Sequence, residues 1–225
     1  KIEVGQKVKG KIVNVEDYGA FLEINAGVEG LIHVSEVAWS NEPINARDFF
    51  KLGDEHESIV MTIDREDRKM SLSLKQLTPD PWNEIGNNFF FKDIKNNVKT
   101  LKDFKGKYVY IDVWATWCKP CKVEHTFLKQ LEEHFSNNDE LQIISISTDR
   151  EYDKWEKYII ENSIEGVQLY SGANSGFVNF FDIGALPRFI FIDKEGIVIS
   201  SEEIRPSNPE LLKKLDSTVY NKGYN

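Results

Sequence analysis

Hydrophobic and polar positions follow two different patterns along the chain, and the pattern changes near residues 78–88. Before this segment, short runs of alternating hydrophobic and polar residues are separated by Gly, Asp and Asn. Alternation with a period of two predicts a strand, because successive side chains of a strand point to opposite faces. The runs are KVKGKIVNV, YGAFLEI, GLIHV, SIVMTI and KMSLSL. They predict a small, all-β barrel of five strands.

Residues 89–225 show a different order, in which strands alternate with helices. The runs YVYIDVWA and LQIISIS are typical of buried strands, and FIFID followed by KEG and IVIS predicts a hairpin. Hydrophobic residues at helical spacing predict helices over residues 118–135, 152–159 and 209–215. The alternation of strands and helices predicts an α/β sheet.

The segment TPDPWNEIGNN, residues 78–88, is the expected domain boundary. It contains two prolines, one glycine and three asparagines, all of which favour turns or loops. A chain of 225 residues also has room for two domains of modest size. We therefore predict a first domain over residues 1–82, a linker over 83–88 and a second domain over 89–225.

The charge balance limits the partners that we expect. The chain has 28 Lys and Arg against 37 Asp and Glu, a net charge of −9, which argues against extensive coating of nucleic acid. Residues 1–83 hold 10 basic and 15 acidic residues, so the first domain carries a charge of −5. Because phosphate neutralisation supplies most non-specific affinity for nucleic acid, this negative charge predicts that any contact of the first domain with nucleic acid is weak. No hydrophobic run approaches the roughly 18 residues of a membrane span, so no membrane segment is expected in this chain.

Three flat side chains stand on neighbouring predicted strands of the first domain. Tyr18 and Phe21 flank Gly19, and His33 lies in the next strand. On an OB-type barrel such side chains form a platform on which bases stack, with about 1–3 kcal/mol per base. The alternative interpretation is that the aromatic rings belong to the barrel core and that His33 is structural.

The combination of YGAF, GLIHVSE and IDREDRKMSLSLKQL is specific, and it resembles the S1 RNA-binding repeat. This repeat is the OB-fold module of bacterial ribosomal protein S1, and the resemblance extends over about residues 2–82. It implies an OB barrel that contacts single-stranded RNA. The positions that match the family's RNA contacts are Tyr18, Phe21, His33, Asp64 and Arg68. The ribosomal protein joins several such modules, and avidity offsets the weak binding of each.

Both cysteines of the chain lie in DVWATWCKPC, residues 112–121. A structural zinc site needs four ligands; the cysteines supply two and His125 could share their helix face, but no strong fourth ligand stands near. A c-type haem signature requires His at Lys122, and a disulfide across two intervening residues closes too small a loop to add much stability. A redox dithiol fits better. A strand that leads directly into a helix places Cys118 at the helix N-terminus, where the dipole stabilises a thiolate, with Cys121 one turn inward.

The order of LKDFKGK, WATWCKPCKVE and ALPRFIFIDKEG resembles the thioredoxin-like TlpA/ResA-type thiol–disulfide oxidoreductases, over about residues 83–215. The resemblance implies a thioredoxin fold in which Cys118 attacks a substrate disulfide and Cys121 resolves the mixed disulfide. It also implies a cis peptide bond before Pro187, which faces the cysteines. Glu124 matches a glutamate that assists proton transfer, although a solvated helix residue is the alternative. Trp117 is expected to pack around the site and to line it.

The leading prediction is a thiol–disulfide oxidoreductase, reductive in direction, that carries a weak RNA-binding module. Its redox group is the Cys118–Cys121 disulfide, and no other cofactor and no metal is expected. Its expected partners are a disulfide-containing protein substrate, an upstream electron donor and single-stranded RNA. The alternative is an RNA-binding or ribosome-associated protein with a catalytically passive thioredoxin-like domain. The two resemblances imply different compartments, the cytoplasm and the extracytoplasmic space. An artificial fusion and a natural RNA-linked redox protein both account for this pairing.

Overall fold

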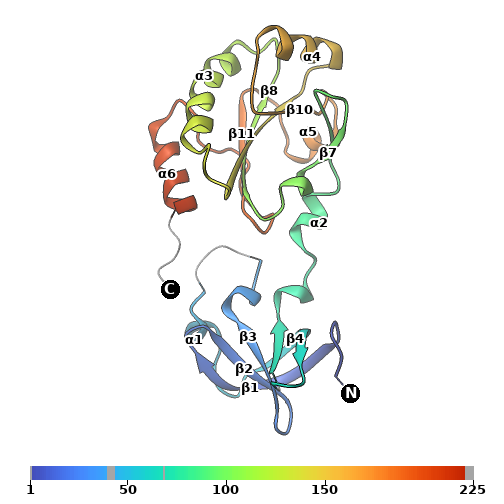
Figure 1. The fold of residues 1–225 in the computed structure, drawn as a ribbon, viewed down its shortest axis with the longest axis vertical. Helices are drawn as coiled ribbons and strands as arrows, with labels where there is room; N and C mark the ends of the chain where they lie inside the picture. The colour runs from blue at the N-terminus through green and yellow to red at the C-terminus, as the bar shows by residue number, and fades with distance from the viewer. Residues whose placement is uncertain (1, 40–43, 68, 221–225) are drawn as a thin grey trace. The chain divides into compact units, whose positions relative to one another are not determined.

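The structure is a computed structural model that describes residues 2–39, 44–67 and 69–220 (Figure 1). The chain forms two compact units, Lys1–Asp80 and Pro81–Asn225. The division falls two residues before the predicted domain end. The residues predicted as a linker belong to the second unit, where helix α2 spans Pro81–Ile85. The segment was predicted as a linker because of its loop-forming composition. It also contains two hydrophobic residues, Trp82 and Ile85, that are buried in the core of the second unit.

The first unit is a closed barrel in which the strands follow the order β1-β2-β3-β5-β4. This confirms the predicted barrel of five strands. Strands β3 and β5 pair in parallel, and the other neighbours are antiparallel. The elements are β1 (Lys7–Glu16), β2 (Gly19–Asn25), β3 (Val28–His33), η1 (Val34–Glu36), α1 (Ala46–Phe49), β4 (Glu55–Asp64), β5 (Lys69–Ser73) and η2 (Lys75–Leu77).

The two-residue period of the strands separates the interior of the barrel from its outer face. Ala20 and Leu22 on β2 are fully buried, as are Ile32 on β3 and Leu72 on β5. Phe21 lies between the two buried residues of β2 and is only half-buried. Because successive side chains of a strand point to opposite faces, Phe21 is on the outer face of the barrel.

The second unit is built on a seven-stranded sheet of order β12-β11-β8-β9-β10-β6-β7. The interior strand β8 pairs in parallel with β9 and antiparallel with β11. The strands are β6 (Phe90–Asp93), β7 (Val98–Thr100), β8 (Tyr108–Trp114), β9 (Leu141–Ser147), β10 (Val167–Tyr170), β11 (Arg188–Ile192) and β12 (Val198–Ser200). The two edge strands, β7 and β12, are only three residues long. The predicted strands β8 and β9 and the β11–β12 hairpin are present, whereas the β6–β7 hairpin was not expected.

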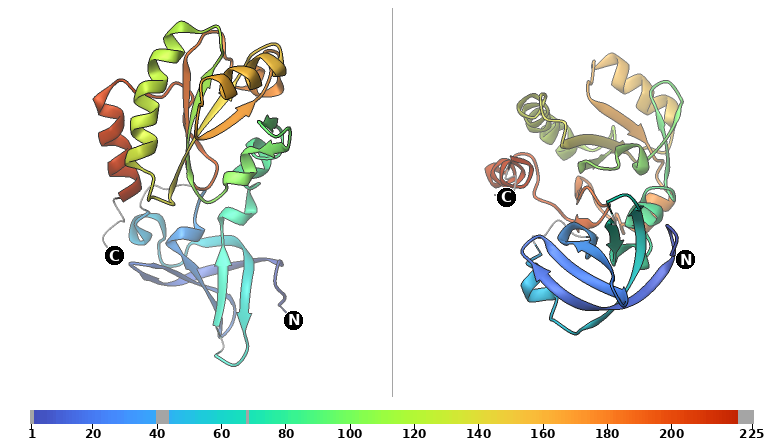
Figure 2. Two further views of the ribbon diagram at one scale, coloured as in Figure 1. Left: turned by 45° about the horizontal axis from the view of Figure 1, so that its top comes forward. Right: turned by 60° about the horizontal axis from the view of Figure 1, so that its bottom comes forward.

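Helices cover both faces of this sheet. Tyr108 and Tyr110 of β8 pack in one cluster with α3 (Lys119–His134) and α6 (Pro209–Tyr220). Val109, Ile111 and Val113 alternate with them and pack in a second cluster with α2 and α5 (Gly176–Phe180). Both views of Figure 2 draw α3 and α6 side by side. The remaining helices are η3 (Leu101–Phe104) and α4 (Tyr152–Glu161). Within the described residues, no helix combines the length and the apolar character that a membrane span requires.

Candidate functional site

The two cysteines lie where β8 leads into α3. Cys118 is the N-cap of α3 and Cys121 lies in its first turn, with Pro120 at a helical position where a missing N–H is tolerated. The two residues form a disulfide, and the N–H of Cys121 donates a hydrogen bond to Sγ of Cys118 (3.2 Å). Cys118 is 3% exposed and Cys121 is fully buried. The unpaired N–H groups and the dipole of α3 would stabilise a thiolate at Cys118 after reduction.

A buried carboxylate fixes the segment that leads to Cys118. Asp149 follows β9 and is 4% exposed. It accepts hydrogen bonds from the N–H (2.9 Å) and the hydroxyl (2.7 Å) of Thr116 and from the hydroxyl of Ser147 (2.8 Å). Thr116 stands two residues before Cys118, so Asp149 positions the start of the motif. The one signal of this contact in the sequence is that both residues follow neighbouring parallel strands.

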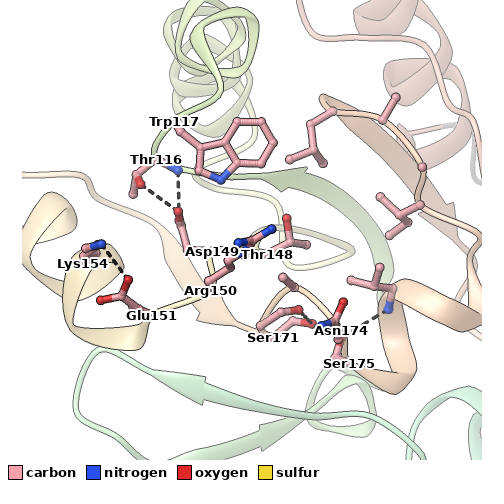
Figure 3. Close-up of a pocket in the computed structure, with 17 residues that line it drawn as sticks. Thr116, Trp117, Thr148, Asp149, Arg150, Glu151, Lys154, Ser171, Asn174 and Ser175 are labelled. Atoms are coloured by element: carbon pink, nitrogen blue, oxygen red, sulfur yellow. Dashed lines mark hydrogen bonds and ion pairs between the residues drawn. The ribbon is translucent and has the colours of Figure 1, made fainter.

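A cavity of about 1180 Å³ lies beside the motif, and Figure 3 shows the side chains around it. We call it the Trp117 cavity. It is lined by Thr116, Trp117, residues 148–151, Lys154, residues 171–175, Val178 and residues 183–186. The indole of Trp117 is 68% exposed. The last lining residue, Leu186, is joined to Pro187 by a cis peptide bond and packs against the cluster that contains both cysteines. The structure therefore brings Trp117 and the loop before Pro187 to one site beside the dithiol.

Glu124 lies one turn after Cys121 on α3 and is only 5% exposed. Its Oε2 accepts a hydrogen bond from the N–H of Ser207 and its Oε1 accepts one from the Ser207 hydroxyl, both at 2.9 Å. The guanidinium of Arg205 lies 3.7 Å from Oε1. Glu124 is therefore not a solvated helix residue, and it ties α3 to the segment before α6. A role in proton transfer remains a prediction.

The structure adds a buried acid–histidine pair that was not predicted. Asp112 of β8 is fully buried, and its Oδ2 lies 3.2 Å from Nε2 of His125 and accepts a hydrogen bond from the Ser145 hydroxyl (3.3 Å). Burial raises the pKa of Asp112, and the contact with His125 offsets part of that rise. In the sequence, the signal for this buried pair is the acidic residue inside the hydrophobic run YVYIDVWA.

His125, considered above as a possible zinc ligand, faces Asp112. The described residues contain no group of three or more His, Cys, Asp or Glu that could hold a metal ion.

The first unit brings three of the predicted RNA-contacting residues to one region. Tyr18 precedes β2 and is 49% exposed. The pairing of β2 with β3 places Gly19 opposite His33 and Phe21 opposite Leu31. Directly opposed residues share a face, so Phe21 and His33 are diagonal neighbours on the outer face. Gly19 allows this close approach of the two strands, because a Cβ at this position would lie only 2.3 Å from the carbonyl oxygen of Ile32.

Asp64, another predicted RNA contact, lies at the turn that follows β4. Asp64 ends β4, and its Oδ1 accepts hydrogen bonds from the N–H groups of Glu66 and Asp67, both at 2.9 Å. These bonds give Asp64 a role in shaping the turn. Arg68 lies outside the described residues.

Two family models match the chain in the order of its two units. The S1 RNA binding domain matches residues 1–75, and Redoxin matches residues 83–217. Small ribosomal subunit protein bS1 from Pseudomonas aeruginosa is 30% identical over 208 residues, which are 87% of this chain and 34% of that protein. The protein of the same name from Chlamydia trachomatis is 41% identical over 85 residues, 38% of this chain and 15% of that protein. The chain thus spans about a third or less of the length of these relatives.

Solved structures extend the comparison to the second unit. A solution structure from Bacteroides vulgatus, assigned as a thiol–disulfide oxidoreductase, is 36% identical with a TM-score of 0.56. The match covers 65% of this chain and 92% of that one. The thioredoxin domain of another thiol–disulfide oxidoreductase from Bacteroides vulgatus is 28% identical with a TM-score of 0.52, over 58% of this chain and 92% of that one. The predicted resemblances to S1 repeats and to thioredoxin-like oxidoreductases are confirmed.

Proposed function

The chain belongs to the redoxin family through residues 83–217, and we propose that its second unit is a thiol–disulfide oxidoreductase that uses Cys118 and Cys121. The observation that carries this proposal is the position of the pair. Cys118 caps α3 beside the Trp117 cavity, and Cys121 is buried one turn further along the helix. This arrangement supports Cys118 as the attacking thiol and Cys121 as the resolving thiol.

The reaction follows from these two positions. In the reduced protein, the Cys118 thiolate attacks one sulfur of a substrate disulfide, the substrate S–S bond breaks, and the departing thiolate takes up a proton. Cys121 then loses its proton and attacks Sγ of Cys118, which releases the second substrate thiolate. Two electrons pass from the dithiol to the substrate, and the Cys118–Cys121 disulfide forms. An upstream dithiol donor must reduce this disulfide before the next cycle.

Reduction of insulin disulfides, with dithiothreitol as the donor, tests the proposal. Cys118→Ser is expected to abolish turnover, and Cys121→Ser is expected to accumulate a mixed disulfide that migrates as an adduct on a non-reducing gel. Circular dichroism of both variants checks that they fold. A Cys118→Ser variant that reduces insulin at the unmodified rate would remove the assignment. The reductive direction has its own test, a redox titration of the pair. A potential nearer to about −270 mV than to about −120 mV would support it.

We propose that the first unit binds single-stranded RNA weakly, through the platform of Tyr18, Phe21 and His33. The exposure of Tyr18 and the shared outer face of the other two residues support stacking of bases. Two cations on β1 already form exposed ion pairs, Lys7 with Glu57 and Lys9 with Glu55. They are therefore less available to neutralise phosphates, and this supports a low affinity for RNA.

Titration of a labelled oligouridine at low and high salt tests this second function. Combined Tyr18→Ala and Phe21→Ala is expected to remove binding, whereas Leu52→Ala, at a residue that is 70% exposed outside the platform, is expected to leave it unchanged. Equal binding by both variants would contradict the platform. RNA binding together with an inactive dithiol would favour the alternative, an RNA-binding protein with a passive thioredoxin-like domain.

The two domain types support different compartments, cytoplasmic for RNA contact and extracytoplasmic for redox work. We propose that either a natural RNA-linked redox protein or an artificial fusion explains the pairing. A transcript that spans the codons of residues 70–100 in a source genome would establish the natural protein. Its absence would favour the fusion.

A further inference from the structure

The Trp117 cavity is larger than the roughly 300–1,000 Å³ of ordinary small-molecule pockets. Its volume of about 1180 Å³ has room for a short peptide segment. Thr116 and Trp117 line the cavity and directly precede Cys118. When the disulfide of a protein substrate reacts with Cys118, the residues beside the substrate cysteine would therefore lie against this cavity.

The charged side chains that line the cavity differ in whether they have a partner. The carboxylate of Asp149 is buried and accepts three hydrogen bonds. Glu151 and Lys154 neutralise one another, with Oε1 and Nζ 2.6 Å apart. Arg150 is exposed, and in the part of the chain that the structure describes it forms no ion pair. In the view of Figure 3, its guanidinium is drawn between Trp117 and Ser171. The cavity thus presents one guanidinium without an ion pair among the described residues, near an exposed indole.

We propose that the Trp117 cavity selects protein segments that carry a carboxylate near the reactive cysteine, with Arg150 as the specificity-determining residue. This inference rests on the proposed oxidoreductase function and names its substrate class. A guanidinium binds a carboxylate through two parallel hydrogen bonds, which gives direction as well as attraction. A basic segment would lie beside an unpaired cation and bind less well. The exposed face of Trp117 accepts the hydrophobic part of the same segment.

Peptide disulfides that differ at one position beside the cysteine, as Glu, Gln or Lys, test the selection. We expect kcat/KM to fall in the order Glu, Gln, Lys, with about two- to five-fold between the first two, the effect of one exposed ion pair. Arg150→Glu is expected to reverse the order. Lys157→Glu is the matched control, because it makes the same charge change at a side chain of α4 that is 72% exposed and outside the cavity.

The order Glu, Gln, Lys should persist in Lys157→Glu, and the redox potential of the dithiol should be equal in all three proteins. An unchanged order in Arg150→Glu, or a reversed order in Lys157→Glu, would overturn the inference. If kcat/KM for the reduction of glutathione disulfide falls on Arg150→Glu as strongly as it falls for the Glu peptide, the assignment of the cavity to a protein segment would be overturned. Equal reduction of all three peptides by the unmodified protein would remove this inference and leave the oxidoreductase function intact. Failure to reduce any peptide would instead count against the oxidoreductase function.

Discussion

Asp149→Ala removes the carboxylate that holds the segment before Cys118. Three hydrogen bonds end on this carboxylate, and the donors on Thr116 and Ser147 would lose their acceptor in a largely buried place. Hydrogen bonds to a charged group contribute about 1.5–3 kcal/mol each, but losses within one network do not add. We expect the free energy of unfolding of the second unit to fall by about 2–4 kcal/mol. For a unit of about 145 residues, this corresponds to roughly 6–16 °C in Tm.

The same change should affect catalysis at temperatures where the variant is folded. Without Asp149, Thr116 is free to move, and it stands only two residues before Cys118, the attacking residue of the proposed reaction. Small misplacements of reacting groups cost rates of up to about a hundredfold. We therefore expect kcat/KM for insulin reduction to fall by about tenfold or more, and the assay is turbidity of the reduced insulin together with thermal unfolding.

Glu151→Ala provides the control for this prediction. It removes a carboxylate from the lining of the same cavity, but the side chain of Glu151 is 61% exposed and is paired with the exposed Lys154. An exposed pair contributes about 0.2–1 kcal/mol, so Tm and kcat/KM should change little. Asp149→Ala and Glu151→Ala that unfold and react alike would refute the role of the hydrogen bonds around Asp149.

Three further variants test features of the second unit. Trp82→Ala should cost that unit about 3–5 kcal/mol in chemical denaturation, because a fully buried indole that donates a hydrogen bond to the carbonyl of Lys194 is lost; a loss confined to the first unit would contradict this. Asp112→Asn should raise Tm, and more at pH 8 than at pH 4. Burial raises the pKa of Asp112 in the folded protein above its value in the unfolded chain. The folded state therefore loses stability as the pH rises from the unfolded-state pKa through the folded-state pKa, whereas Asn carries no charge at any pH. A gain in Tm that is independent of pH would refute this. Glu124→Gln should slow insulin reduction and cost about 1–2 kcal/mol through weaker bonds to Ser207; an unchanged rate would argue against proton transfer.

Local patterns predicted much of the fold and the dithiol. The buried strand β8, the motif CKPC and the hydrophobic stripe of α3 are contiguous in the sequence, so the position of Cys118 at a helix N-terminus follows from short-range information. The five short alternations of the first unit likewise predicted its barrel.

The features that were not predicted depend on long-range contacts or short elements. Trp82 lies among loop-forming residues, and it belongs to the second core through contacts with residues distant in the sequence, such as Lys194, 112 residues away. Asp149 and Thr116 are 33 residues apart and meet because β8 and β9 end side by side. The strands β6 and β7 have four and three residues, which is too short for a period to appear.

The two edge strands of the sheet also bear on how the protein behaves at high concentration. A long free edge offers a row of unpaired N–H and C=O groups on which a second chain can add as a strand. Here β7 and β12 offer three residues each, and β7 carries Lys99 at its centre, while the closed barrel of the first unit has no edge strand. Both units therefore resist templated growth into fibrous aggregates. An extended substrate of the proposed oxidoreductase would also find little sheet edge on which to pair, so we expect it to be recognised by the loops around the dithiol.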